Sequence, residues 1–438
     1  MKHGALFWLA AKVAPHLAIV ALSSLTLANN CSGRQQAQEQ TGKGRLAEAR
    51  AVGSAKFKSE QIIAAAGLQV GAEVGRDDFQ QAADKLAKCG RFLNVQYRYG
   101  DAEAGVRVEF QVTDAPSVPA WFDNFPWFSD DELNATLKSS VLLFDGTVPE
   151  GGWILDEISD ALQLQIGKVG AHNTVSHSLI TAPGADQRVQ QFRVDDPNLN
   201  VASLEFGDAL AENDRGLRAH RPDIVGAKYS RTALALFEIE QVRPLYLSHG
   251  FVRVKFLTPT AKVVGSSVSV TAPVEPGPVF TWRAPTWMGA TVFGPLELAA
   301  MIPLHEGEVA DGTRIERGWQ SVSNEYAERG YLDANLSPVP HFDETARTVA
   351  YAVSVTEGPQ YHMGALVLTG LSTEGEKRVR AAWKIPQGAV FNRAVYEDFM
   401  ASRMREAFSG LPFHYEKIGR FLREDSKNAT VDVLIDFQ

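Results

Sequence analysis

The sequence predicts an α+β protein of five tandem two-layer domains, each a three-stranded sheet covered by two helices in the order β-α-α-β-β. Three observations predict this architecture. One glycine recurs every 80 residues, in the series Gly90, Gly170, Gly250, Gly330 and Gly410. A proline series with a period of 81 residues, and a second glycine series with nearly the same period, accompany it: Pro116, Pro197, Pro278 and Pro359, and Gly146, Gly226, Gly307 and Gly388. Three series with one period indicate an internal repeat, long enough for each unit to hold a small core.

The fourth unit shows the order of elements most clearly. An extended segment at 279–282 precedes a short helix over 295–301, which begins with a proline at a favourable first-turn position. A longer helix over 312–329 has apolar residues three and four positions apart, and Gly330 ends it. Two strands that alternate apolar and polar residues follow, at 331–339 and 348–355.

The other units repeat this order. In the first unit we expect helices at 59–66 and 78–88 and strands at 95–99 and 106–112. In the second we expect one helix that begins at the capping box 129–132, another over 153–166, and strands at 174–180 and 188–194. In the fifth we expect a strand at 365–368, helices at 374–383 and 394–408, and strands at 413–418 and 430–437. The third unit diverges, because Pro222 breaks its first helix and Pro244 is expected to kink a second helix over 233–247.

The N-terminus is typical of an export signal. Met1, Lys2 and His3 precede an apolar stretch over 17–27 that closes on small residues at 26–28. An uncleaved anchor over 5–28 is the alternative, although Lys12 and Pro15 interrupt it. Cys31 is a candidate for lipidation, but the preceding Ala28-Asn29-Asn30 fits that signal poorly. The expected boundaries are a signal peptide at 1–28, a flexible tether at 29–45, and domains at 46–116, 117–197, 198–277, 278–358 and 359–438.

Three short motifs resemble those of a known family. They are Tyr-Ala-Glu-Arg-Gly-Tyr at 326–331, Val-Ser-Val-Thr-Glu-Gly-Pro at 353–359 and Leu-Val-Leu-Thr-Gly at 366–370. These motifs resemble the POTRA (polypeptide-transport-associated) domain, whose arrays form the periplasmic arm of outer-membrane assembly factors, in front of a β-barrel. The resemblance covers about residues 46–438 and is loosest in units two and three. Because no barrel-like sequence follows the fifth unit, a dedicated arm or a barrel-less relic is expected.

The resemblance implies a periplasmic scaffold that binds unfolded outer-membrane polypeptides, or a barrel or lipoprotein partner, with membrane association left open. The strand after each recurring glycine would lie at a sheet edge, where a polypeptide can add a further strand. The alternative is an adaptor that docks on a fixed partner in an envelope division or secretion complex. Lys255, Pro338 and Pro340 would discourage pairing at two of the edges. The residues expected to bind polypeptide are Val95, Tyr97, Val175, Val252, Val254, Phe256, Leu336, Phe413 and Tyr415.

Composition and motifs argue against other classes of function. The chain carries a net charge of -9 and no long basic run, which makes nucleic acid an unsuitable partner. No G-x-S-x-G, H-E-x-x-H, P-loop or C-x-x-C motif occurs, so we expect no catalysis, cofactor or metal site. An aromatic cluster in the second unit is interpreted as local core, with an exposed contact patch as the alternative: Trp121, Phe122, Phe125, Trp127 and Phe128.

Overall fold

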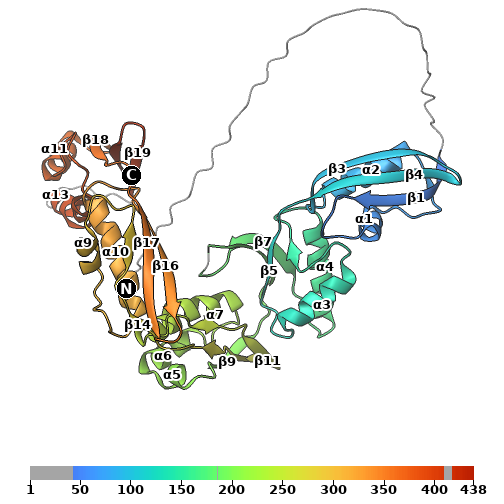
Figure 1. The fold of residues 1–438 in the computed structure, drawn as a ribbon, viewed down its shortest axis with the longest axis horizontal. Helices are drawn as coiled ribbons and strands as arrows, with labels where there is room; N and C mark the ends of the chain where they lie inside the picture. Colours follow the sequence, from blue (N-terminus) through green and yellow to red (C-terminus); the bar gives the residue numbers. More distant parts are fainter. Residues whose placement is uncertain (1–42, 185, 409–416) are drawn as a thin grey trace, which may run out of the picture.

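The computed structural model of the chain describes residues 43–184, 186–408 and 417–438. The predicted export signal, Cys31 and residues 29–42 of the predicted tether lie outside these residues. Gly44 and Arg45, which the sequence analysis assigns to the tether, are part of the first strand. Five consecutive stretches each contain a mixed sheet, and we number them blocks 1 to 5 for reference: 44–114, 118–194, 199–275, 280–356 and 361–437. In Figure 1, blocks 1 and 2 form one arm and blocks 4 and 5 form another, with block 3 at the bend between them.

Blocks 1 and 2 follow the expected order of elements. Block 1 consists of β1 (Gly44–Val52), α1 (Ser59–Ala66), β2 (Glu73–Val74), α2 (Arg76–Ala87), β3 (Phe92–Ala102) and β4 (Gly105–Asp114). Block 2 consists of β5 (Val118–Asp123), α3 (Asp130–Ser140), β6 (Thr147–Val148), α4 (Ile154–Gly167), β7 (Val175–Thr181) and β8 (Arg188–Val194).

Blocks 4 and 5 repeat the order with small variations. Block 4 consists of β14 (Thr281–Trp282), β15 (Thr286–Met288), α9 (Pro295–Ala300), α10 (Gly312–Glu328), β16 (Asn335–Asp343) and β17 (Thr348–Thr356). Block 5 consists of β18 (His362–Thr369), α11 (Thr373–Ala382), α12 (Arg393–Asp398), η3 (Phe399–Arg403), α13 (Met404–Ala407), β19 (Ile418–Asp425) and β20 (Thr430–Phe437).

Block 3 is the most irregular, as its two prolines predict. Its first helical segment is divided into α5 (Ala209–Asn213), α6 (Arg215–His220) and η1 (Arg221–Asp223), and its second runs through α7 (Arg231–Phe237), η2 (Glu238–Val242) and α8 (Arg243–Ser248). The π-helical turn η2 ends two residues before Pro244, which cannot donate a backbone hydrogen bond. The strands are β9 (Asn200–Glu205), β10 (Lys255–Phe256), β11 (Thr260–Val264), β12 (Ser267–Thr271) and β13 (Val274–Glu275).

All five blocks share one strand topology. The last long strand lies in the middle, parallel to the first strand and antiparallel to its hairpin partner, as in the order β1-β4-β3. The hairpin explains the antiparallel pair, and the return through two helices explains the parallel one. A short bridge also joins residues 28 positions apart in every block: Arg45–Glu73, Pro119–Thr147, Asn200–Lys228, Thr281–Val309 and His362–Val390. In blocks 1 and 2 this bridge extends to β2 and β6, which give four-stranded sheets where three strands are expected.

Local signals for helix ends are confirmed. Ser129 caps α3 and exchanges hydrogen bonds with Glu132, as the capping box predicts. The described glycines of the 80-residue series have left-handed φ values of 86°, 77°, 82° and 83° at Gly90, Gly170, Gly250 and Gly330. Glycine recurs there because other residues rarely adopt this backbone conformation.

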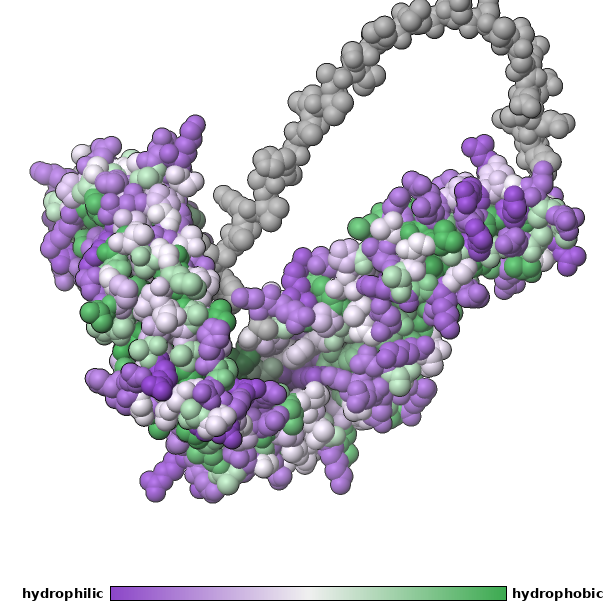
Figure 2. Space-filling view, in the orientation of Figure 1, coloured by the Kyte–Doolittle hydropathy of each residue, from purple (hydrophilic) through white to green (hydrophobic). Residues whose placement is uncertain are grey.

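The buried apolar residues form four clusters among the described residues. Blocks 3, 4 and 5 each contain one cluster, but blocks 1 and 2 share a single cluster that runs from Leu46 to Val194. The small cores expected for the first two units are therefore continuous with each other. In the part of the chain that the structure describes, no helix is both long and apolar enough to cross a bilayer. On the face shown in Figure 2, hydrophilic residues cover most of the surface and apolar residues are scattered.

Candidate functional site

Among the residues that the structure describes, the first strand of each hairpin lies at a free edge of its sheet. These edge strands are β3, β7, β11, β16 and β19. Val95 and Tyr97 lie on β3, Val175 lies on β7 and Leu336 lies on β16, in the edge strands where the sequence places them. An edge strand carries backbone N–H and C=O groups that a further strand can pair with.

One of the expected edges, that of block 3, is not where the sequence analysis puts it. In block 3 the edge strand is β11, and the segment expected to form it contains only the two-residue strand β10, which pairs with β13. Val252 packs against the core of block 4, while Val254 and Phe256 pack against the core of block 3, so their apolar side chains serve cores instead of an edge. Phe413 and Tyr415 lie outside the described residues, and the described edge strand of block 5 is β19.

The joint between blocks 2 and 3 holds a buried polar cluster that sequence reasoning missed. Arg231, at the start of α7, donates to both carboxylate oxygens of Asp130 at 2.6 and 2.8 Å and to the carbonyl of Phe122 at 2.8 Å. Its guanidinium lies 4.9 Å from the centre of the Trp121 ring. Burial lowers the pKa of Arg231, but the hydrogen bonds and charge of Asp130 outweigh this and raise it.

Two neighbouring side chains extend this cluster. Asp123 is fully buried and accepts hydrogen bonds from the backbone N–H of Thr232 at 3.2 Å, the Thr232 hydroxyl at 2.9 Å and Gln191 at 3.0 Å. Asn124, in a left-handed conformation, accepts from the N–H of Arg231 at 3.2 Å. We define Asp123, Asn124, Asp130, Arg231 and Thr232 as the polar joint. No sequence motif marks it, because its partners lie about a hundred residues apart.

A buried carboxyl on η2 is influenced by the same arginine. Glu238 is 5% exposed, and its Oε1 has no hydrogen-bond partner among the described residues. Burial raises the pKa of Glu238 to about 7, although the charge of Arg231 opposes the shift. This carboxyl can therefore change its charge near neutral pH.

Some rings of the aromatic cluster of block 2 belong to its core, and one ring also contacts block 3. Phe122 and Phe125 are buried in the shared core of blocks 1 and 2. Trp127 is half-buried and packs against that core and the core of block 3. With Phe128 and the first turn of α3, these rings line a cavity of about 410 Å³ beside Arg231. The interpretation as core accounts for the buried members, and Trp127 bridges two blocks.

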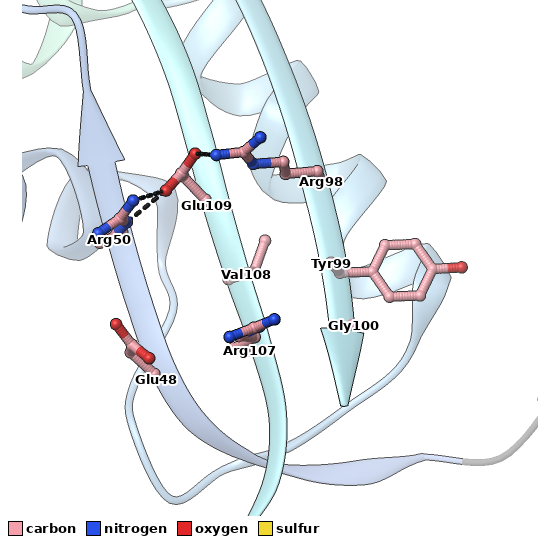
Figure 3. Close-up of a pocket in the computed structure, with 8 residues that line it drawn as sticks. All are labelled: Glu48, Arg50, Arg98, Tyr99, Gly100, Arg107, Val108 and Glu109. Atoms are coloured by element: carbon pink, nitrogen blue, oxygen red, sulfur yellow. Dashed lines mark hydrogen bonds and ion pairs between the residues drawn. The ribbon is translucent and has the colours of Figure 1, made fainter. Parts of the chain in front are cut away.

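The open face of the block 1 sheet carries a row of charges. Figure 3 shows Glu109 of β4 held between Arg50 of β1 and Arg98 of β3, with Arg107 and Glu48 beside them in a groove of about 410 Å³. The hydrogen bond from Arg50 lowers the pKa of the half-buried Glu109 carboxyl. Since positive and negative side chains alternate on this face, it resembles a solvated sheet surface more than a binding site for one ligand. Among the described residues, no group of His, Cys, Asp and Glu side chains could hold a metal ion.

Comparisons with known proteins agree with the motifs. Residues 286–358, most of block 4, match the family model described as "POTRA: Surface antigen variable number repeat". A protein of Treponema pallidum (strain Nichols), described as "Putative outer membrane protein assembly factor", is 21% identical over 171 residues, which are 39% of this chain and 20% of that protein. The match thus spans about a fifth of the length of that relative.

Two solved structures are also similar. The crystal structure of Haemophilus influenzae BamA POTRA3-5 has 19% identity and a TM-score of 0.43, covering 55% of this chain and 96% of that one. POTRA1-3 of the periplasmic domain of Omp85 from Anabaena has 12% identity and a TM-score of 0.18, covering 90% and 95%. From its motifs and from the family match over 286–358, the chain resembles a POTRA array of the kind found in bacterial outer-membrane protein assembly factors.

Proposed function

We propose that this chain is a non-catalytic, exported scaffold of the outer-membrane protein assembly type, which works in the periplasm by binding polypeptides through strand addition at its sheet edges. The observation that carries the proposal is the repeated topology, which leaves a hairpin strand at a free edge in each of the five blocks. Pairing through backbone groups depends little on side-chain sequence, so it suits a protein that handles many unfolded chains.

The family match supports this proposal in its general form. Residues 286–358 match the POTRA family, and the relative from Treponema pallidum is described as an assembly factor. The division into five domains within the boundaries given above is part of the same proposal, as is association with the outer membrane. Its partners would be unfolded outer-membrane polypeptides or a barrel or lipoprotein subunit.

Site-specific crosslinking in the native bacterium tests the proposal. Photo-reactive residues placed at His177 on β7, Val263 on β11 and Leu422 on β19 should capture polypeptides in the periplasm. A matched probe at Arg107, on the open face of the block 1 sheet, serves as the control. If the edge probes capture no more protein than the face probe does, strand addition is not how this chain works.

A further inference from the structure

The five free edges are not equally open to a further strand. Natural edge strands avoid unwanted pairing by means of charges, prolines and short length. Pro338 and Pro340 on β16 have no N–H group, and proline fits only where its nitrogen faces away from the neighbouring strand, so this outer edge lacks two donors. β11 has only five residues and carries Lys262, while charged residues occupy β3 and β19: Arg98 and Asp101, and Arg420, Arg423, Glu424 and Asp425.

The edge strand of block 2 has none of these features. β7 reads Val-Ser-His-Ser-Leu-Ile-Thr over seven residues, with no proline, glycine, lysine, arginine or carboxylate. The equivalent edge in block 1 is also crowded on its helix side, where Tyr97 and Tyr99 stack on each other beside Phe79 of α2. β7 is therefore the edge best suited to pairing among the described hairpin strands.

The hydrogen bonds at the two ends of β7 show which residues face outward. Asp195 N–H donates to the carbonyl of Thr174 at 2.9 Å, and Ala182 N–H donates to the carbonyl of Gln187 at 2.8 Å. In an antiparallel ladder the inward-facing positions alternate, so even-numbered residues from 174 to 182 face β8 and odd-numbered residues face away. The outward residues are Val175, His177, Leu179 and Thr181.

A side chain already occupies the first outward position. The Gln163 amide of α4 donates to the carbonyl of Asn173 at 2.7 Å and accepts from the N–H of Val175 at 2.9 Å. It thus makes the same two bonds that a neighbouring strand would make. The outward N–H and C=O groups of His177, Leu179 and Thr181 have no partner among the described residues. An incoming strand would therefore pair from His177 onward, in a register limited by Gln163.

The helix beside this edge gives the incoming strand a chemical preference. Asp156, Asp160 and Gln163 share one face of α4 at a spacing of about one helical turn, and Gln163 bonds the backbone of β7. His177 Nδ1 lies 4.0 Å from Asp156 Oδ1 and 3.2 Å from Ser159 Oγ. Asp156 and Asp160 are exposed, and Lys85 of α2, whose charge acts on Glu157, lines the same pocket as these two carboxylates. Alternate side chains of an added strand would face these two carboxylates.

We propose that the β7 edge from His177 to Thr181 takes up an extended polypeptide segment whose alternate side chains are basic and face Asp156 and Asp160 of α4. This inference rests on the proposed function and adds the block, the register and the class of segment. The two carboxylates select among segments, and the backbone groups of His177, Leu179 and Thr181 hold them.

Peptide binding to the purified full chain tests this inference. The probes are two fluorescent seven-residue peptides, one alternating valine with lysine and the other alternating valine with glutamate, followed by anisotropy. Leu179→Pro removes an outward N–H without breaking a bond to β8, and should weaken the lysine peptide at least about tenfold. Asp156→Asn with Asp160→Asn should weaken it about threefold or more, and the loss should shrink at high salt.

Leu422→Pro is the matched control. Lys417 and Gln438 exchange hydrogen bonds in block 5, so Leu422 also faces outward, from β19. Thermal unfolding of each variant shows whether its fold is kept. If only Leu422→Pro weakens binding, strand addition stands and the β7 assignment is overturned. If both peptides bind equally, the preference for basic segments is overturned. If neither peptide binds the unaltered chain, the proposed function itself fails.

Discussion

The joints that connect blocks 3, 4 and 5 differ from the joint between blocks 2 and 3. The carbonyl of Gly250 accepts a hydrogen bond from Phe280 N–H at 3.1 Å, and that of Gly330 accepts one from Tyr361 N–H at 2.8 Å. Two residues after each glycine, Val252 and Leu332 pack into the core of the next block. These two joints repeat at the period of the sequence.

The joint between blocks 2 and 3 departs from this pattern. A side chain added at Gly170 would meet nothing, and His172, which occupies the position of Val252 and Leu332, is exposed. The polar joint, with Trp127 packed against both cores, takes the place of the contact made after the glycine, and Arg231 donates hydrogen bonds to Asp130 and to the carbonyl of Phe122. The difference shows that a repeat can preserve the fold of each block while one of its joints is built from different chemistry.

Replacing the central arginine should have the largest effect. Arg231→Met leaves Asp130 and the Phe122 carbonyl without their partner in a mostly buried place, which should cost about 3 kcal/mol. Arg243→Met, which breaks the exposed pair with Glu316 between blocks 3 and 4, should cost less than about 1 kcal/mol. Hydrogen exchange in α7 and α8 with urea unfolding measures both, and equal losses would contradict the proposed distinction between the joints.

Substitutions at Gly330 and Gly170 should have the next largest difference in effect on the free energy of unfolding. A Cβ at Gly330 would stand 2.8 Å from the Tyr361 carbonyl oxygen and 2.9 Å from Val390, in addition to the unfavourable φ. Gly330→Ala should therefore cost about 2 to 3 kcal/mol, and Gly170→Ala, which has only the φ to overcome, about 1 kcal/mol. Urea midpoints of the two variants provide the test. If Gly170→Ala lowers the free energy of unfolding as much as Gly330→Ala does, the joint between blocks 2 and 3 is also tightly packed.

The apolar contact two residues after the glycine should give a smaller difference in stability between the joints. Leu332→Ala removes a half-buried side chain from the core of block 5 and should cost about 1 to 2 kcal/mol. His172→Ala, at the equivalent place, should change the free energy of unfolding by less than about 0.5 kcal/mol. Thermal unfolding compares them, and a destabilised His172→Ala variant would show that this histidine supports the joint.

The smallest effect should depend on pH. Because burial raises the pKa of Glu238 to about 7, its ionised form is disfavoured in the folded state. Stability from this group is therefore greatest below pH 4.5, declines as pH rises towards 7, and is lowest above it. Glu238→Gln should stabilise the protein by about 1 kcal/mol at pH 8 and have little effect at pH 4. Unfolding curves at the two pH values check this, and a gain of the same size at both would contradict the shifted pKa.

Sequence reasoning predicts much of the fold and part of the candidate site. The capping box at Ser129, the helix end at Gly330 and the break around Pro244 are local signals, and each appears where expected. The edge strand of block 3 is misplaced, because apolar residues such as Val252 have the same alternation whether they form an edge or fill a neighbouring core. Alternating apolar and polar residues indicate that one face of a strand is buried, but they do not indicate which element covers that face.

The sequence by itself determined the repeat, the order of elements in each block and the mixed α+β class, because these follow from interactions between residues close in the chain. Only the tertiary structure decided which edge is open and how the joints are made. Gln163 covers one outward position of β7, and Arg231 bonds Asp130 from 101 residues away. Such contacts depend on where separate elements meet in space, and no local pattern encodes that meeting.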